Sequence, residues 1–151
     1  AHEHPKSENE LSIFLAGPSP RGKEDYNWRI KALEYLNNKK FKGMVYIPLP
    51  KDNNWLENYD AQIDWELMYL NKANAIAFWI PRDLVHLPGF TTNVEFGMFL
   101  KSDKIVLGYP KNARKMRYLH YLANLNNVPV FDTLEETLDS SIFLANKKSA
   151  I

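Results

Sequence analysis

Short apolar runs alternate with longer amphipathic stretches along almost the whole chain of 151 residues. The runs of strand length are 11–16, 44–47, 75–80, 104–108 and 128–131. The amphipathic stretches that follow them are 24–38, 59–72, 92–101, 113–125 and 133–145. This alternation is typical of a parallel sheet with helices on both faces, and the near-continuous apolar run 75–80 fits a central strand. We therefore predict an α/β fold, a flavodoxin-like doubly wound five-stranded parallel sheet, whose strand order the spacing leaves open.

The same pattern sets the expected domain boundaries. Residues 1–10 are polar and lack the apolar segment of a signal peptide, so we expect a disordered leader followed by a single domain over 11–151. In the first helix, the apolar residues expected to face the core are Trp28, Ala32, Leu33 and Leu36.

Composition narrows the chemistry that this domain can perform. The chain has no cysteine, which excludes disulfide bonds, thiol nucleophiles and Cys-ligated metal centres. Its formal net charge of +1 argues against a dedicated nucleic-acid binder, and no window reaches the roughly 18 consecutive apolar residues of a membrane span. The histidines show no metal-ligand spacing, so we expect no metal and no cofactor. A reducing, cytoplasmic setting fits this composition best.

Open sheets of this type bind ligands beyond the carboxyl ends of their strands, so the loops 17–23, 48–58 and 81–92 are the expected binding region. The first of these loops has neither the G-x-G-x-x-G nor the Walker pattern. It does place Ser19 and Arg21 just before a helix, where hydroxyl, guanidinium and backbone donors suit a phosphate or another anion. The alternative is a proline-stiffened turn with solvated basic residues.

Two glutamates in the following helices are the candidate acid–base and nucleophilic groups. Glu66 interrupts a largely apolar stripe of the helix 59–72, so it lies either at the rim, reaching solvent or an arginine, or in a cleft where burial raises its pKa. Glu95 follows the most buried strand, near a helix N-terminus that favours the carboxylate anion, as a nucleophile requires. The structural alternative for Glu95 is a capping box with Thr92 as the N-cap residue.

Several short segments, taken in order, resemble a known family. They are Ile13-Phe14-Leu15-Ala16-Gly17-Pro18, Trp65-Glu66, Ala73-Asn74-Ala75-Ile76, Thr91-Thr92-Asn93-Val94-Glu95-Phe96-Gly97 and Lys104. From about residue 11 to residue 110, their order and spacing are similar to those of the nucleoside 2-deoxyribosyltransferases and their N-glycosidase relatives. The resemblance implies a transferase or hydrolase that exchanges or cleaves the N-glycosidic bond of a (deoxy)nucleoside or a nucleoside 5′-monophosphate.

The resemblance also implies roles for particular residues. Glu95 matches the nucleophile that attacks the anomeric carbon to form a glycosyl-enzyme, and Glu66 matches the acidic residue that contacts the base and helps to protonate it as it leaves. Substrate contacts are implied for Phe14, Gly17, Ser19, Arg21, Trp55, Gly89, Thr92 and Asn93. The expected partners are a small-molecule nucleoside or nucleotide and further copies of the chain in a homodimer or higher homo-oligomer, and neither a nucleic-acid polymer nor a membrane.

Two positions depart from the family's pattern. Phe14 stands where many of the transferases have Tyr, and Gly89 stands where they often have Asp. Both changes remove polar groups from the expected site, which leaves open a non-catalytic nucleotide-binding or sensing module. A separate alternative is an assembly subunit of the same architecture, in which Glu66 and Glu95 are purely structural. The loop 19–22 is more similar to the phosphate-binding loop of the 5′-monophosphate glycosidases, which favours a nucleotide substrate.

Aromatic residues are numerous for a chain of this size, with four Trp, eight Tyr and eight Phe. Trp28 and Phe78 fit the interior of a helix and a strand. Five others fall in or beside the expected binding loops, where a planar base could stack on them or another subunit could pack: Tyr46, Trp55, Tyr59, Trp79 and Phe90.

Overall fold

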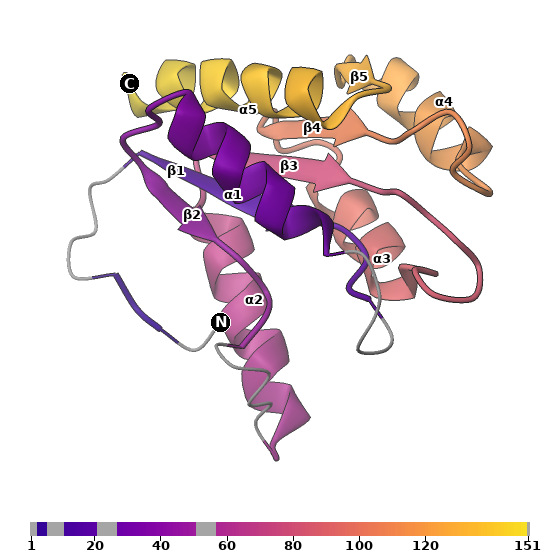
Figure 1. Cartoon of the computed structure of the whole chain (residues 1–151), viewed down its shortest axis with the longest axis horizontal. Coiled ribbons are helices and arrows are strands. Elements are labelled where there is room, and N and C mark those ends of the chain that lie inside the picture. The colour runs from indigo at the N-terminus through magenta and orange to yellow at the C-terminus, as the bar shows by residue number, and fades with distance from the viewer. Residues whose placement is uncertain (1–2, 6–10, 21–26, 51–56, 151) are drawn as a thin grey trace.

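The computed structural model describes residues 3–5, 11–20, 27–50 and 57–150, which form one parallel sheet of five strands surrounded by five helices (Figure 1). The strands are β1 (Ser12–Ala16), β2 (Met44–Tyr46), β3 (Ala75–Trp79), β4 (Ile105–Gly108) and β5 (Val130–Phe131). The helices are α1 (Trp28–Asn38), α2 (Tyr59–Lys72), α3 (Phe90–Phe99), α4 (Arg117–Leu125) and α5 (Leu134–Ser149). Each element overlaps the segment predicted for it, so the predicted alternation is confirmed.

The strand order is β2-β1-β3-β4-β5, the flavodoxin-like order of a doubly wound sheet, and this confirms the predicted fold class. β3 lies between β1 and β4, as predicted for the central strand. From β1 the chain runs outward to β2 and then returns across the sheet to β3, so the direction of winding reverses between β1 and β3. The loops that leave the carboxyl ends of these two strands therefore diverge, and space for a ligand opens between them.

Helices cover both faces of the sheet and make two hydrophobic cores. Side chains that alternate along β1 divide between them: Ile13 and Leu15 pack with α1 and α5, whereas Phe14 and Ala16 pack with α2, α3 and α4. Figure 1 shows α2 and α3 on the opposite side of the sheet from α1 and α5. None of the helices in the described ranges is long and apolar enough to cross a membrane.

The first helix begins later than its pattern predicts. Asn27 is its N-cap residue, and the Asn27 side chain accepts a hydrogen bond from the backbone N–H of Arg29. Trp28 is fully buried, as predicted, but Leu33 is 38% exposed, so the prediction that it faces the core is wrong. The reason is that Arg29, Ala32 and Leu36 form the buried face of α1, and the side chain of Leu33 lies to one side of that face.

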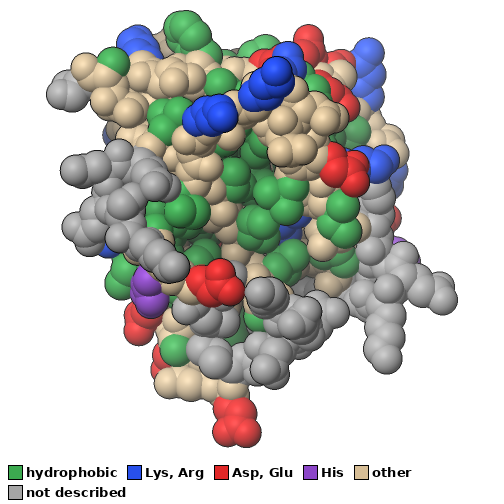
Figure 2. All heavy atoms as spheres, turned by 60° about the vertical axis from the view of Figure 1, so that its left-hand side comes forward, with side chains coloured by type: hydrophobic (Ala, Val, Ile, Leu, Met, Phe, Trp, Pro, Cys, Tyr) green, Lys and Arg blue, Asp and Glu red, His purple; other side chains and the backbone are tan. Residues whose placement is uncertain are grey.

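The edge strand β2 is only half-buried. Figure 2 brings the side of the molecule with this edge forward and shows hydrophobic side chains in the middle of the face, with Lys and Arg along its upper margin.

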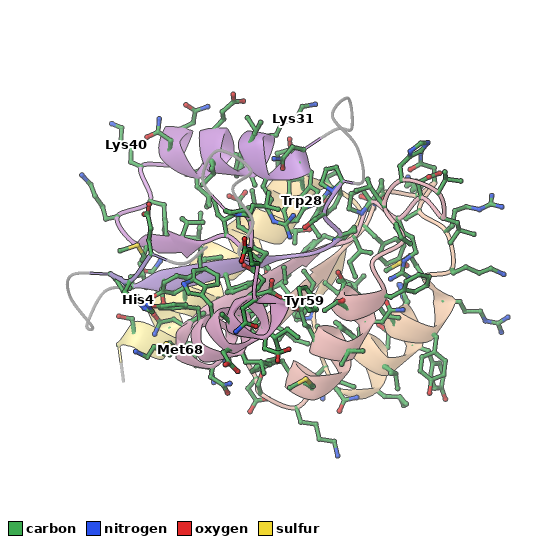
Figure 3. The ribbon with its side chains drawn as sticks, turned by 90° about the horizontal axis from the view of Figure 1, so that it is seen from below. His4, Trp28, Lys31, Lys40, Tyr59 and Met68 are labelled. Atoms are coloured by element: carbon green, nitrogen blue, oxygen red, sulfur yellow. The ribbon has the colours of Figure 1, made fainter. Side chains whose placement is uncertain are left out.

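Part of the predicted leader contacts α2. The Trp65 indole N–H donates to the backbone oxygen of Glu3, and His4 is hydrogen-bonded to the hydroxyl of Tyr69. His4 lies beside α2 in Figure 3.

Candidate active site

A cavity of about 260 Å³ lies at the carboxyl ends of β1, β2 and β3. Its walls come from the segments that follow β1 and β2, from α2, and from the connection between β3 and α3 together with the first turns of α3. Six of the sequence-predicted site residues line it: Gly17, Ser19, Glu66, Gly89, Thr92 and Glu95. The predicted binding region therefore contains a cavity, at the reversal of the strand order.

Gly17 permits the close packing of the first loop on the sheet. A Cβ atom at this position would lie 2.1 Å from the backbone oxygen of Trp79 and 2.8 Å from the Trp28 ring. Any side chain would therefore push the loop out of the cavity wall or displace the end of β3. The role of Gly17 is to let the backbone approach, which places Pro18 and Ser19 at the cavity.

The start of α3 differs from the predicted capping box. Gly89 is the N-cap residue, with a φ angle of +64° that glycine tolerates, and no side chain caps this end of the helix. Thr92 is a buried residue of the first turn of α3, and it lines the cavity. The capping-box interpretation is therefore wrong, because the helix begins two residues earlier than predicted and Glu95 lies in its second turn. The side chain of Glu95 therefore does not cap the helix, and it lines the cavity instead.

Glu95 and Glu66 reach the same cavity from adjacent helices. Glu95 is buried, with 9% of its surface exposed, whereas Glu66 is half-buried. Burial first, and then the negative charge of Glu66 and a hydrogen bond with it, raise the pKa of Glu95 to about 8. A glutamate with this pKa keeps its proton at neutral pH, so the cavity contains a side chain that can donate a proton.

Gln62 fixes the position of Glu66 from one turn earlier in α2. Its side-chain nitrogen donates to Oε1 of Glu66 at 2.6 Å and to the backbone oxygen of Pro48 at 3.2 Å. These two bonds tie the acidic side chain to the segment after β2. The Glu66 carboxyl group is thus held toward the cavity rather than toward solvent, whereas Asp60 and Asp64 on the same helix are exposed.

Arg29 is a site residue that the sequence reasoning missed. Its fully buried guanidinium donates to the backbone oxygens of Leu15 at 3.2 Å and of Gly17 at 2.7 Å, and to the Ser19 hydroxyl at 3.3 Å. Its charge lowers the pKa of Glu95 and so opposes the rise described above, while burial lowers the pKa of Arg29 itself to about 10. A signal was present in the sequence, since Arg29 falls at helical spacing from Ala32 and Leu36 on the buried side of α1.

Ser19 is oriented by this arginine. Because its oxygen accepts the bond from Arg29, its hydroxyl hydrogen can be donated to a ligand in the cavity. The other residue of the predicted anion loop, Arg21, lies outside the described residues.

Other predicted substrate contacts lie elsewhere or are not described. Phe14 is fully buried and packs near Trp65, so it supports the cavity from behind without facing it. Asn93 points to the other side of α3, where its side-chain oxygen accepts a hydrogen bond from Arg82. Trp55 lies outside the described residues.

The aromatic residues predicted in or beside the binding loops also differ in whether they line the cavity. Tyr59 and Phe90 line the cavity and are 64% and 71% exposed, and Tyr59 lies at the first turn of α2 in Figure 3. Tyr46 instead packs on Tyr69, with ring centroids 4.5 Å apart, and Trp79 is buried in the core. Of the four that the structure describes, it therefore brings two, Tyr59 and Phe90, to the place where a planar base could stack.

The fold and the site together define a class: a small doubly wound α/β protein with paired carboxyl groups at its switch point. Among the described residues, no group of three or more His, Asp or Glu side chains could hold a metal ion. The sequence model of the family described as nucleoside 2-deoxyribosyltransferase like matches residues 10–113, a span that includes Glu66 and Glu95. The match covers more than half of the chain, so the protein belongs to this family, whose substrates are small-molecule nucleosides. No curated protein matches the chain significantly.

Proposed function

We propose that the protein cleaves or exchanges the N-glycosidic bond of a (deoxy)nucleoside or a nucleoside 5′-monophosphate, with Glu95 as the nucleophile. The observation that carries this proposal is the pairing of buried Glu95 with Glu66 at one cavity, where the pair holds a proton at neutral pH. One nucleophile and one proton donor are the two groups that this reaction needs from the enzyme.

In the proposed reaction, a carboxylate oxygen of Glu95 forms a bond with the anomeric carbon as the bond between that carbon and the base breaks. The electron pair of the broken bond leaves with the base, and the proton of the glutamate pair passes to the base through Glu66. The sugar has oxocarbenium character in the transition state. A second base or a water molecule then attacks the anomeric carbon as the bond from that carbon to Glu95 breaks. The proton that the attacking molecule loses passes to Glu66, which restores the glutamate pair and completes a transfer or a hydrolysis.

Neighbouring residues support these roles by holding the reacting groups in place. Gln62 orients Glu66 through its hydrogen bond of 2.6 Å. Arg29 stabilises the anionic form of Glu95 by its charge, and it holds Gly17 and Ser19 in the loop that closes one side of the cavity. Tyr59 and Phe90 offer exposed rings for the base.

A nucleotide substrate is supported by Ser19. Its hydroxyl faces the cavity, and Arg29 directs the hydroxyl hydrogen away from the guanidinium, as a phosphate acceptor requires. Replacement of Ser19 by alanine is expected to raise KM for 5′-monophosphates more than for the matching nucleosides. Equal effects on both substrate types would exclude a phosphate contact by Ser19.

The direct test is a panel of deoxynucleosides, ribonucleosides and their 5′-monophosphates, each incubated with and without an acceptor base. The wild type is expected to release or exchange a base, whereas Glu95→Gln, which keeps the shape of the side chain but cannot attack, is expected to be inactive. Asp64→Asn on the exposed side of α2 is the matched control and should retain full activity. Turnover by Glu95→Gln at the wild-type rate would disprove the mechanism.

The alternative is a non-catalytic nucleotide-binding module, and it is favoured by the raised pKa of Glu95, which keeps this group protonated below about pH 8 when no substrate is bound. Calorimetry that shows tight nucleotide binding, together with no base release at any pH by mass spectrometry, would support this alternative. Base release that requires Glu95 would exclude it.

We also propose that the chain forms a homo-oligomer. Large hydrophobic side chains are exposed on α3, among them Val94 and Met98, and Phe143 is exposed on α5. Such side chains are common where a second copy of a protein packs. Analytical ultracentrifugation should give a mass of at least two chains, and a mass of one chain would refute the proposal.

A further inference from the structure

A second hollow, of about 510 Å³, lies between α3, α4 and the loop that follows β3. It shares Pro88 and Phe90 with the active-site cavity but contains neither Glu66 nor Glu95. Most of its walls are apolar side chains, including those of Leu84, Phe96, Leu119 and Leu122. Its polar groups are the side chains of Arg82, Asn93 and Lys115 and the hydroxyl of Tyr118. This hollow has no part in the reaction proposed above.

Arg82 is a buried arginine in the wall of this largely apolar hollow. It is 5% exposed, and its guanidinium donates to the backbone oxygen of Lys115 at 3.3 Å and to the side-chain oxygen of Asn93. Its Nε atom is buried and makes no hydrogen bond in the described structure. No carboxylate pairs with Arg82 among the described residues, and burial lowers its pKa. A buried charge without a counter-ion is costly, so a bound anion would stabilise this region.

The residues that line the hollow add positive charge and no negative charge. Lys115 is exposed at the hollow, and none of the described residues that line it is acidic. The N-terminus of α4 lies beside Lys115, and no side chain caps it. The positive end of this helix therefore also favours an anion here.

We propose that this hollow binds a small monocarboxylate with an aromatic or branched aliphatic body. The carboxylate would pair with Arg82 and Lys115, and the body would lie against Phe96, Leu119 and Leu122. The volume is in the range of small-molecule sites, and the largely apolar walls match an apolar body. A single buried cation matches one negative charge, since a second charge would lie against apolar walls without a buried partner.

Phenylacetate is a suitable probe, and phenylacetamide is its uncharged control of nearly the same shape. Binding is followed by chemical-shift changes of the ¹⁵N-labelled protein during titration. We expect saturable shifts for the amides of Asn93, Gly97 and Leu119, and affinity for phenylacetamide weaker by about tenfold or more, because a charge-assisted hydrogen bond is lost. Equal affinity for both compounds, shifts confined to the Glu66 and Glu95 cavity, or no saturable binding would overturn the proposal.

Three variants test the residues involved. Arg82→Met removes the charge and is expected to weaken binding by about tenfold or more, whereas Arg114→Met removes a nearby exposed charge and is expected to leave it unchanged. If Arg82→Met does not fold, Gly97→Leu still decides, because Gly97 lines the hollow and a Cβ there meets no atom within 4 Å. The leucine is expected to fill the hollow and abolish binding without strain. Unchanged binding by Gly97→Leu, or equal losses in Arg82→Met and Arg114→Met, would refute the site.

Discussion

The raised pKa of Glu95 predicts a pH-dependent stability that Glu95→Gln removes. In the unfolded chain Glu95 loses its proton near pH 4.5, whereas in the folded protein it keeps the proton to about pH 8. Between these values the folded state binds more protons than the unfolded state, so the free energy of unfolding falls as the pH rises. The stabilising contribution is complete below pH 4.5 and is lost above pH 8.

The size of this effect follows from the pKa values. A rise from 4.5 to about 8 corresponds to about 4 to 5 kcal/mol, at roughly 1.4 kcal/mol for each pKa unit. Glutamine has the shape of the protonated side chain and cannot ionise. At each pH, the free energy of unfolding of the wild type is subtracted from that of Glu95→Gln. This difference is expected to be larger at about pH 9 than at about pH 5 by about the same 4 to 5 kcal/mol.

Urea denaturation followed by tryptophan fluorescence, at constant ionic strength, measures this difference at each pH. Titrating groups that do not interact with Glu95 act on both proteins and cancel in the comparison. The exposed-residue control Asp64→Asn should keep the pH dependence of the wild type. If the free-energy difference between Glu95→Gln and the wild type is the same at both pH values, Glu95 is not held in its protonated form and the reasoning is wrong.

Three further changes have defined outcomes. Glu66→Gln removes the negative charge and the hydrogen bond that raise the pKa of Glu95, so the alkaline limb of the kcat/KM profile, where the proton needed by the base is lost near pH 8, should move to lower pH in any remaining activity; an unmoved limb would show that Glu66 does not act on Glu95. Gly17→Ala should destabilise the protein by about 2 kcal/mol or more in urea denaturation, because its Cβ would lie 2.1 Å from a backbone oxygen; wild-type stability would contradict the packing. Leu138→Ala leaves a cavity beneath α5 and should cost about 2 to 5 kcal/mol in the same assay, and a loss below about 1 kcal/mol would place Leu138 outside the core.

Much of the fold is determined by local pattern. The apolar run that forms β3 predicted a central strand, and the periodicity of residues 59–72 predicted α2 with the bounds found in the structure. The ends of helices were less predictable. α1 begins at Trp28 because Asn27 caps it, and α3 begins at Phe90 because Gly89 adopts a left-handed conformation, a choice that competes with the equally plausible Thr92 cap.

The candidate site, like the fold, could be predicted from the sequence only in part. From the sequence alone, the chemistry was confined to carboxylates and hydroxyls, and Glu66 and Glu95 stood out by their places on two predicted helices. Only the tertiary structure decided that these two glutamates share one cavity, where burial raises the pKa of Glu95, that Arg29 holds the first loop, and that Asn93 belongs to the hollow of Arg82. The physical reason is that periodicity and turn residues act over a few positions, whereas burial, charge coupling and cavity walls arise from elements that meet only after the sheet is wound.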